Sequence, residues 1–117
     1  MPCVLALVDD LFFVSKMLET SKHAGVEFKA AANPDVLLAL MKDAAPALVI
    51  VDLNARYGGP AAVEQVRASG YSGPLIGFLS HVQVELAAQA KAAGCSQVLP
   101  RSQFTQNLAQ ILAQAKG

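Results

Sequence analysis

The sequence has little charge, few aromatic residues and no tryptophan. Charged residues make up 15% of its 117 residues, and aromatic residues make up 6%. Nine Lys and Arg residues balance nine Asp and Glu residues, so the formal net charge at pH 7 is zero. Because proteins that bind nucleic acids or acidic membranes rely on a positive surface, we expect direct contact with neither.

The sequence also lacks a cysteine-rich metal pattern, a secretory signal and a membrane-spanning segment. Its two cysteines, Cys3 and Cys95, are far apart, which is typical of buried thiols in a reducing compartment; a disulfide remains an alternative. No basic segment precedes an apolar stretch at the N-terminus. No apolar run has the length that a bilayer requires. We therefore expect a soluble cytoplasmic protein.

Hydrophobic residues are abundant, at 54% of the chain. This is enough to bury a core without disulfides or metals, and the length fits one domain over residues 1–117. Short apolar runs alternate with segments of helical spacing. The runs cover residues 3–8, 26–31, 47–52, 75–80 and 96–99. The central runs are almost wholly apolar, as in strands that are covered on both faces.

The segments between these runs carry helix signals. Asn33 followed by Pro34 predicts a helix start, and Gly94 predicts the end of a helix over residues 82–93. The last segment predicts one helix with a single apolar face, formed by Phe104, Leu108, Ile111, Leu112 and Ala115. Strict strand–helix alternation predicts an α/β three-layer sandwich, with a five-stranded parallel sheet in the order 2-1-3-4-5 and helices on both faces.

Side chains that could take part in chemistry follow four of the five predicted strands. Asp9 and Asp10 end the first run, and Asp52 ends the third. Ser80 ends the fourth run, and Arg101 follows the fifth. Because the crevice of a parallel sheet lies at the carboxyl ends of its strands, we expect three carboxylates, a hydroxyl and a cation at one edge.

A cation between the carboxylates would offset the repulsion between the adjacent aspartates. Carboxylate oxygens suit a hard divalent cation such as Mg²⁺. A carboxylate held beside Mg²⁺ can also accept a phosphoryl group, since the metal neutralises charge on the transferring oxygens. The pattern therefore predicts a shared acidic site for phosphoryl chemistry.

The whole chain resembles the receiver domains of two-component response regulators. The resemblance rests on the strand-end residues above and on the tail AAGCSQVLPRSQF, which is similar to the receiver pattern A-G-A-x-x-x-L-x-K-x-x-F. It implies the flavodoxin-like receiver fold and a phosphoryl group received from a histidine kinase or phosphotransfer protein. As an enzyme, such a chain would at most phosphorylate itself and remove its own phosphoryl group.

The resemblance also implies roles for five residues. Asp52 matches the phosphoryl acceptor. Asp10 matches the main Mg²⁺ ligand, and Asp9 matches the acidic neighbour that holds metal-bound water. Asn54 matches the residue whose backbone carbonyl completes the metal site. Ser80 matches the hydroxyl that binds the acyl phosphate and couples it to the last helices.

Three features depart from the receiver pattern. Arg101 stands where receivers have a lysine; its planar fork suits a bidentate contact with phosphate or a standing salt bridge to Asp52. Val98 replaces the Tyr or Phe that rotates between buried and exposed states. The loop after Asp52 reads NARYGGPAA, without the usual proline followed by an acidic-Gly pair. These departures favour an alternative, a pseudo-receiver with the same fold and partner surface and no phosphorylation.

Charge is unevenly distributed along the chain. Fourteen of the Asp, Glu, Lys and Arg residues lie in 1–67 and only four in 68–117. Because interface cores are depleted in charge, we expect a protein target or a second copy to bind through residues 82–117. The leading hypothesis is thus a stand-alone receiver that signals through protein contacts.

Two further classes fit the sequence less well. A small Mg²⁺-dependent hydrolase with an aspartate nucleophile would need Asp-x-Asp after the first strand and, as a rule, a cap domain. A flavin-binding domain of flavodoxin type would need a first loop rich in Ser, Thr and Gly, because two aspartates repel a phosphate.

Overall fold

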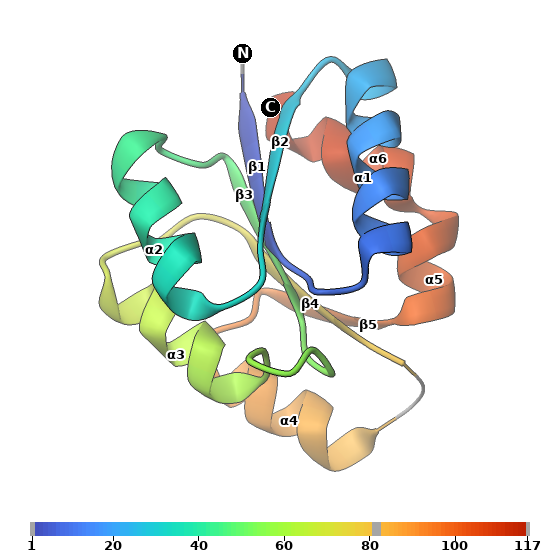
Figure 1. The fold of residues 1–117 in the computed structure, drawn as a ribbon. Coiled ribbons are helices and arrows are strands. Elements are labelled where there is room, and N and C mark those ends of the chain that lie inside the picture. The colour runs from blue at the N-terminus through green and yellow to red at the C-terminus, as the bar shows by residue number, and fades with distance from the viewer. Residues whose placement is uncertain (1, 81–82, 117) are drawn as a thin grey trace.

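A parallel five-stranded sheet forms the centre of the computed structural model, which describes residues 2–80 and 83–116. Its strands are β1 (Cys3–Leu7), β2 (Glu27–Ala31), β3 (Leu48–Asp52), β4 (Leu75–Leu79) and β5 (Gln97–Pro100). They lie in the order β2-β1-β3-β4-β5, and all four neighbouring pairs are parallel. The predicted strand order is therefore confirmed (Figure 1).

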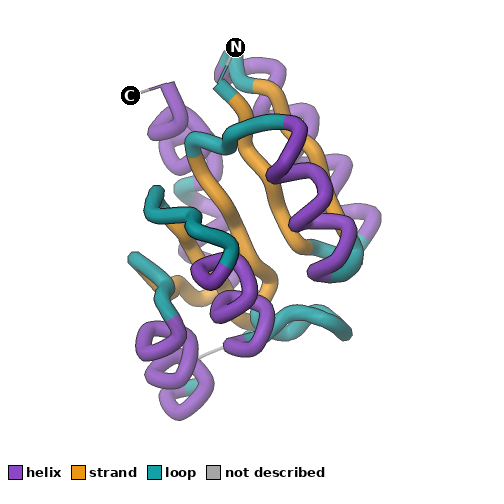
Figure 2. The backbone as a smooth tube through the Cα atoms, turned by 90° about the vertical axis from the view of Figure 1, so that its left-hand side faces the viewer, coloured by secondary structure: helices purple, strands orange, loops and turns teal. Residues whose placement is uncertain are grey.

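Helices cover both faces of the sheet, as the alternation predicts (Figures 1 and 2). One face carries α1 (Leu11–Ala24), α5 (Arg101–Gln106) and α6 (Leu108–Ala113), followed by the 3-10 turn η1 (Gln114–Lys116). The other face carries α2 (Pro34–Asp43), α3 (Pro60–Ala68) and α4 (Val84–Ala93). No helix in the ranges 2–80 and 83–116 combines the length and apolarity needed to cross a bilayer.

Local sequence signals set several helix ends. The Asn33 side chain accepts a hydrogen bond from the Val36 amide at 2.9 Å, so α2 begins at Pro34 as predicted. Gly94 ends α4 with a φ of 134°, a conformation that favours glycine. Position 82, the first of the predicted helix 82–93, lies outside the described residues.

The prediction of one continuous last helix is wrong. The helix is interrupted at Asn107, whose φ of −103° and ψ of 13° depart from helical values, and α6 begins at Leu108. Asparagine favours such breaks because its side chain competes for backbone hydrogen bonds. The apolar spacing nevertheless holds, since Phe104, Leu108 and Ile111 are all buried.

The two faces of the sheet bury different side chains. Under α1, α5 and α6, three phenylalanines pack together: Phe78 stacks on Phe104 at 4.5 Å between ring centroids, and Phe13 meets both rings edge-on. Under α2, α3 and α4 the core is aliphatic and includes many small residues. Two rings of this aromatic core, Phe13 and Phe78, lie close to the guanidinium of Arg101 at the end of β5.

Candidate active site

Asp52 occupies the carboxyl end of the central strand β3. It is 6% exposed and is the single buried charged residue within the described ranges. Its Oδ1 accepts a hydrogen bond from the backbone N–H of Asn54 at 3.0 Å. The carboxylate therefore sits in a partly desolvated position with limited hydrogen-bonding support.

Burial raises the pKa of the Asp52 carboxyl above its ordinary value of 3.8. The hydrogen bond from Asn54 and the positive charge of Arg101 act against this rise in pKa, whereas the charges of Asp9 and Asp10 add to it. The three acidic side chains and the guanidinium thus influence one another electrostatically. Their grouping into one functional site stays a prediction.

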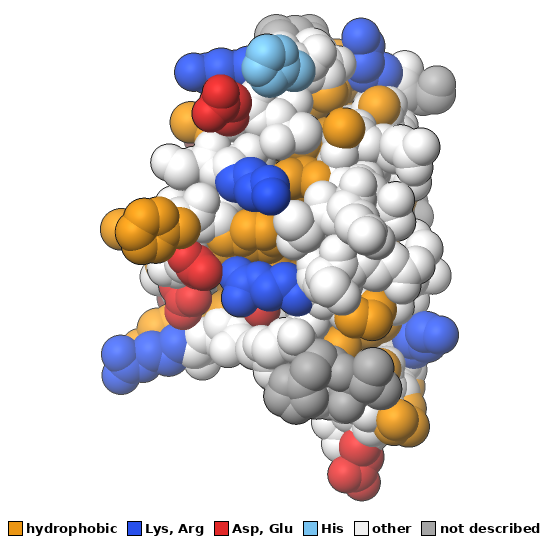
Figure 3. Space-filling view, turned by 90° about the vertical axis from the view of Figure 1, so that its right-hand side faces the viewer, with side chains coloured by type: hydrophobic (Ala, Val, Ile, Leu, Met, Phe, Trp, Pro, Cys, Tyr) orange, Lys and Arg blue, Asp and Glu red, His pale blue; other side chains and the backbone are white. Residues whose placement is uncertain are grey.

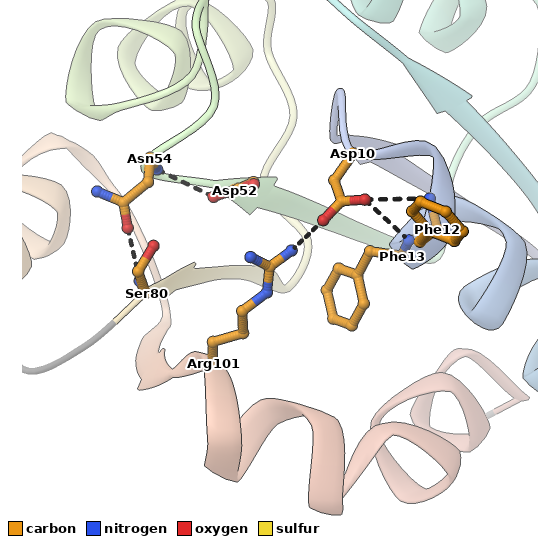
Figure 4. A network of polar contacts seen from close by, with 7 residues as sticks. All are labelled: Asp10, Phe12, Phe13, Asp52, Asn54, Ser80 and Arg101. Atoms are coloured by element: carbon orange, nitrogen blue, oxygen red, sulfur yellow. Dashed lines mark hydrogen bonds and ion pairs between the residues drawn. The ribbon is translucent and has the colours of Figure 1, made fainter.

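Both carboxylate oxygens of Asp10 contact protein groups. As the N-cap of α1, it accepts hydrogen bonds at Oδ1 from the backbone N–H of Phe12 at 3.0 Å and of Phe13 at 3.3 Å. Its Oδ2 pairs with the guanidinium of Arg101 at 3.1 Å (Figure 4). Capping and ion pairing therefore use both oxygens of this carboxylate.

Asp9, although adjacent in sequence, has a different partner. Its Oδ2 accepts a hydrogen bond at 3.0 Å from the backbone N–H of Arg56, in the loop after β3. The two aspartates are thus each compensated by a separate donor. This arrangement explains how two like charges are tolerated side by side at the end of β1.

Arg101 does not form the salt bridge to Asp52 that the sequence left open; it pairs with Asp10 instead. Its guanidinium carbon lies 4.6 Å from the centroid of the Phe13 ring and 5.8 Å from that of Phe78. Such distances allow cation–π attraction to both rings. The aromatic core therefore stabilises the position of the Arg101 guanidinium through its ring faces.

The Asn54 side chain joins the loop after β3 to the segment after β4. Its Oδ1 accepts a hydrogen bond from the backbone N–H of Ser80 at 2.6 Å (Figure 4). Its Nδ2 donates a hydrogen bond to Gln83 Oε1 at 3.0 Å. The sequence suggested a role only for the backbone carbonyl of Asn54. Ser80 is not the cap of α4, because that helix starts at Val84 after Gln83.

Gly58 is a site residue whose importance sequence reasoning missed. A Cβ at this position would collide with the backbone carbonyl oxygen of Asp52. The loop after β3 therefore folds back tightly on the candidate acceptor, and only glycine permits that approach. The Gly-Gly pair in NARYGGPAA was the available signal, and Gly59, with a φ of 99°, also adopts a conformation that favours glycine.

The predicted metal ligands are of the right chemical type for Mg²⁺, since all are oxygen donors. Asp52 and Asp9 each have one carboxylate oxygen outside the hydrogen bonds that they accept from Asn54 and Arg56. Across residues 2–80 and 83–116, however, no three His, Cys, Asp or Glu side chains are grouped closely enough to hold a metal. The metal set thus stays a prediction, with Asp10 occupied by Arg101.

Val98, the residue that replaces the expected aromatic switch, is half-buried against the aliphatic core. It lines a shallow pocket between β5 and α4 together with Leu79, Val84, Ala87 and Pro100. Valine is stiff about χ1, so a rotation between buried and exposed states has no counterpart here.

Comparisons with known proteins place this geometry in context. A scan against protein-family models finds no match. A search of curated proteins likewise finds no similar sequence. Solved structures do match, and those described below are response regulators or their receiver domains.

The chemotaxis response regulator CheY4 of Vibrio cholerae matches with a TM-score of 0.83 and 24% identity, over 98% of each chain. A response-regulator receiver domain from Clostridium thermocellum gives a TM-score of 0.83 at 16% identity, over 98% of this chain and 94% of its own.

NtrX of Brucella abortus, in complex with ADP, matches over 99% of this chain with a TM-score of 0.78 and 21% identity. This chain spans only 27% of that NtrX chain. It covers 96% of the isolated NtrX receiver domain. The chain therefore has the flavodoxin-like fold of response-regulator receiver domains.

Proposed function

We propose that this protein is a response-regulator receiver that accepts a phosphoryl group on Asp52 and signals through protein contacts. One observation carries the proposal. The buried Asp52 carboxylate lies at the end of the central strand, with acidic, hydroxyl and guanidinium side chains supplied by the ends of β1, β4 and β5. The match to receiver folds over nearly the whole chain supports it.

The proposed reaction is a transfer from a phosphohistidine. A carboxylate oxygen of Asp52 attacks phosphorus, the phosphorus–nitrogen bond breaks, and its electron pair returns to the imidazole, which takes a proton from solvent. The product is an acyl phosphate. Water then attacks phosphorus and releases inorganic phosphate, which restores the Asp52 carboxylate.

This chain's own residues have distinct parts in that reaction. The guanidinium of Arg101 neutralises charge on the phosphoryl oxygens through its two-pronged donor geometry. The Ser80 hydroxyl donates a hydrogen bond to the acyl phosphate. Mg²⁺, held by Asp52, the carbonyl of Asn54 and Asp9 or Asp10, would neutralise charge on the transferring oxygens.

The proposed phosphodonor is a protein, a histidine kinase or a phosphotransfer protein. Leu11 and Phe12, at the start of α1, are 81% and 91% exposed and follow directly after the acidic pair. A hydrophobic projection beside acidic side chains is visible on this face (Figure 3). Exposed apolar side chains next to a reactive centre suit the docking of a protein donor.

Output is proposed to pass through the charge-poor region 82–117. White atoms, which belong to the backbone and to side chains that are neither charged nor hydrophobic, cover much of the face in Figure 3, which includes α5 and α6. The apolar pocket beside Val98 and the exposed Val84 lie in the same part of the chain. A protein target or a second copy would bind there.

A second candidate is the pseudo-receiver, which keeps the partner surfaces and is not phosphorylated. The ion pair between Arg101 and Asp10 favours it, because this pair compensates the site without metal or phosphate. Intact mass spectrometry after incubation with acetyl phosphate and Mg²⁺ separates the two candidates. An active receiver gains one phosphoryl group in the wild type and none in Asp52→Asn. An unchanged wild-type mass with acetyl phosphate and with a competent kinase supports the pseudo-receiver.

A further inference from the structure

The guanidinium of Arg101 is held in place from two directions. Its ion pair with Asp10 joins the start of α5 to the start of α1, across 91 positions of sequence. Asp10 is itself fixed by two backbone hydrogen bonds at the N-terminus of α1. Figure 4 shows the guanidinium lying between this carboxylate and Asp52.

The second support is aromatic. The guanidinium lies over the ring of Phe13 and near that of Phe78, and both rings are locked with Phe104 in one packed cluster. A planar cation stacks on such a surface, whereas the compact ammonium of a lysine does not. The rings are buried in one packed cluster, so they offer the guanidinium a fixed surface beside Asp10.

We infer that Arg101 is the resident counter-cation of Asp10 and that it competes with Mg²⁺ for this carboxylate. Oδ1 of Asp10 serves two N–H groups of α1, and Oδ2 serves the guanidinium. A divalent ion that binds Asp10 must therefore displace Arg101 or lie beside a like charge. Both possibilities weaken its binding.

The inference deepens the proposed function, because it makes metal loading of the same site conditional on movement of Arg101. Apparent metal affinity falls in proportion to the fraction of molecules in which Asp10 is free. Once displaced, the guanidinium has Asp52 as a neighbouring acidic group, with which it already interacts electrostatically. Loading of Mg²⁺ would thus redirect the cation of Arg101 toward the proposed acceptor.

The test is a Mg²⁺ titration, followed by amide NMR shifts and calorimetry, with no phosphodonor present. We expect Arg101→Gln to bind Mg²⁺ about tenfold more tightly than the wild type, since it removes the competing charge. Arg56→Gln is the matched control: it also removes one arginine charge near the acidic pair, but that side chain is exposed and its link to Asp9 is through the backbone. We expect its affinity to stay close to that of the wild type.

Two further variants keep the inference falsifiable. Arg101→Lys retains the charge without the planar stack, and we expect its affinity for Mg²⁺ to lie between those of the wild type and Arg101→Gln. If Arg101→Gln fails to fold, Arg101→Lys takes its place in the comparison with the wild type. Adding Asp10→Asn to Arg101→Gln should abolish the gain. Competition is refuted if Arg101→Gln binds no better than the wild type, if neither responds at millimolar Mg²⁺, or if the gain survives Asp10→Asn.

These outcomes are separate from those of the phosphorylation test. Tighter Mg²⁺ binding by Arg101→Gln supports the inference even if Asp52 accepts no phosphoryl group, in which case the proposed function fails. Phosphorylation of Asp52 with equal Mg²⁺ affinities in the wild type and Arg101→Gln would overturn the inference and leave the proposed function intact.

Discussion

Two arginines at opposite ends of the sheet have very different surroundings. Arg67, in the last turn of α3, donates hydrogen bonds to the backbone carbonyls of Gly94, Tyr71 and Gly73 at 2.8–3.0 Å. These bonds tie the loops that lead into β4 and β5 to α3. Arg101, at the carboxyl end of β5, has one charged partner, Asp10, and an aromatic surface beneath it.

The contrast separates an arginine with several backbone partners from one with a single, partly exposed ion pair. The partners of Arg67 are neutral carbonyls that would lose their donor if the guanidinium were removed, which makes the contact costly to break. The partner of Arg101 is a carboxylate at a partly exposed edge, where an ion pair contributes little to stability. An exchangeable contact of this kind suits a site that must accept other charges.

The largest expected effect comes from Arg67→Ala. We expect it to lower the free energy of unfolding by about 2–3 kcal/mol, because several backbone carbonyls lose their donor and the aliphatic part of the side chain no longer packs. Urea denaturation measures the change. Arg56→Ala, at an exposed position, should change it by less than about 0.5 kcal/mol. Equal denaturation midpoints for the two variants would show that the hydrogen bonds of Arg67 do not stabilise the fold.

Asp52→Asn should stabilise the fold at neutral pH in the absence of divalent ions. Burial raises the pKa of this carboxyl in the folded state, so the folded protein binds the proton more tightly than the unfolded chain does. The charged carboxylate therefore costs stability, and this cost grows as the pH rises through and above the ordinary value of 3.8.

Thermal unfolding of the wild type and Asp52→Asn, followed from pH 3 to pH 7 in EDTA, checks this expectation. The advantage of the asparagine variant should be greatest at pH 7 and shrink toward acid pH. An advantage that is the same at every pH would show that desolvation of the charge is not its cause.

Arg101→Lys should have a small effect on stability and a larger one on chemistry. The ion pair is partly exposed and contributes about 0–1 kcal/mol, so the unfolding midpoint should stay near that of the wild type. The yield or lifetime of phosphorylated Asp52, followed by intact mass with acetyl phosphate and Mg²⁺, should change because the cation is no longer planar or stacked on Phe13. A destabilisation as large as that of Arg67→Ala would place Arg101 among the structural residues.

Asn54→Ala should have a modest and local effect on stability. This change removes the side-chain acceptor of the Ser80 amide and the contact with Gln83, both at exposed positions, and we expect a loss of about 0.5–1 kcal/mol. Hydrogen exchange at the Ser80 amide should accelerate, while exchange in β3 stays unchanged. Unaltered protection of that amide would show that Asn54 does not hold the segment after β4.

Much of the fold follows from local sequence patterns. Strand order and helix placement come from the alternation of apolar runs and helical segments, and the start of α2 follows from Asn33 and Pro34. The break at Asn107 does not, because the apolar spacing continues across it. Periodicity records which side chains face the core, and it does not record whether the backbone remains helical between them.

The positions of the candidate site residues at the strand ends follow from the sequence, whereas their contacts do not. Parallel topology alone brings Asp10, Asp52 and Arg101 to one edge. The sequence does not show which carboxylate the guanidinium contacts, because Asp10, Phe13, Phe78 and Arg101 come together only through packing between distant segments. The fit of Gly58 against the Asp52 carbonyl also depends on the folded path of the loop.

The most direct test of the account is to locate the phosphoryl group. Borohydride reduces an acyl phosphate to an alcohol, so treatment after exposure to phosphoramidate and Mg²⁺ converts a phosphorylated aspartate to homoserine, which peptide mass spectrometry can place in the sequence. The account predicts homoserine at position 52 in the wild type and none in Asp52→Asn. Homoserine at position 9 or 10, or a phosphoryl group that persists in Asp52→Asn, would contradict it.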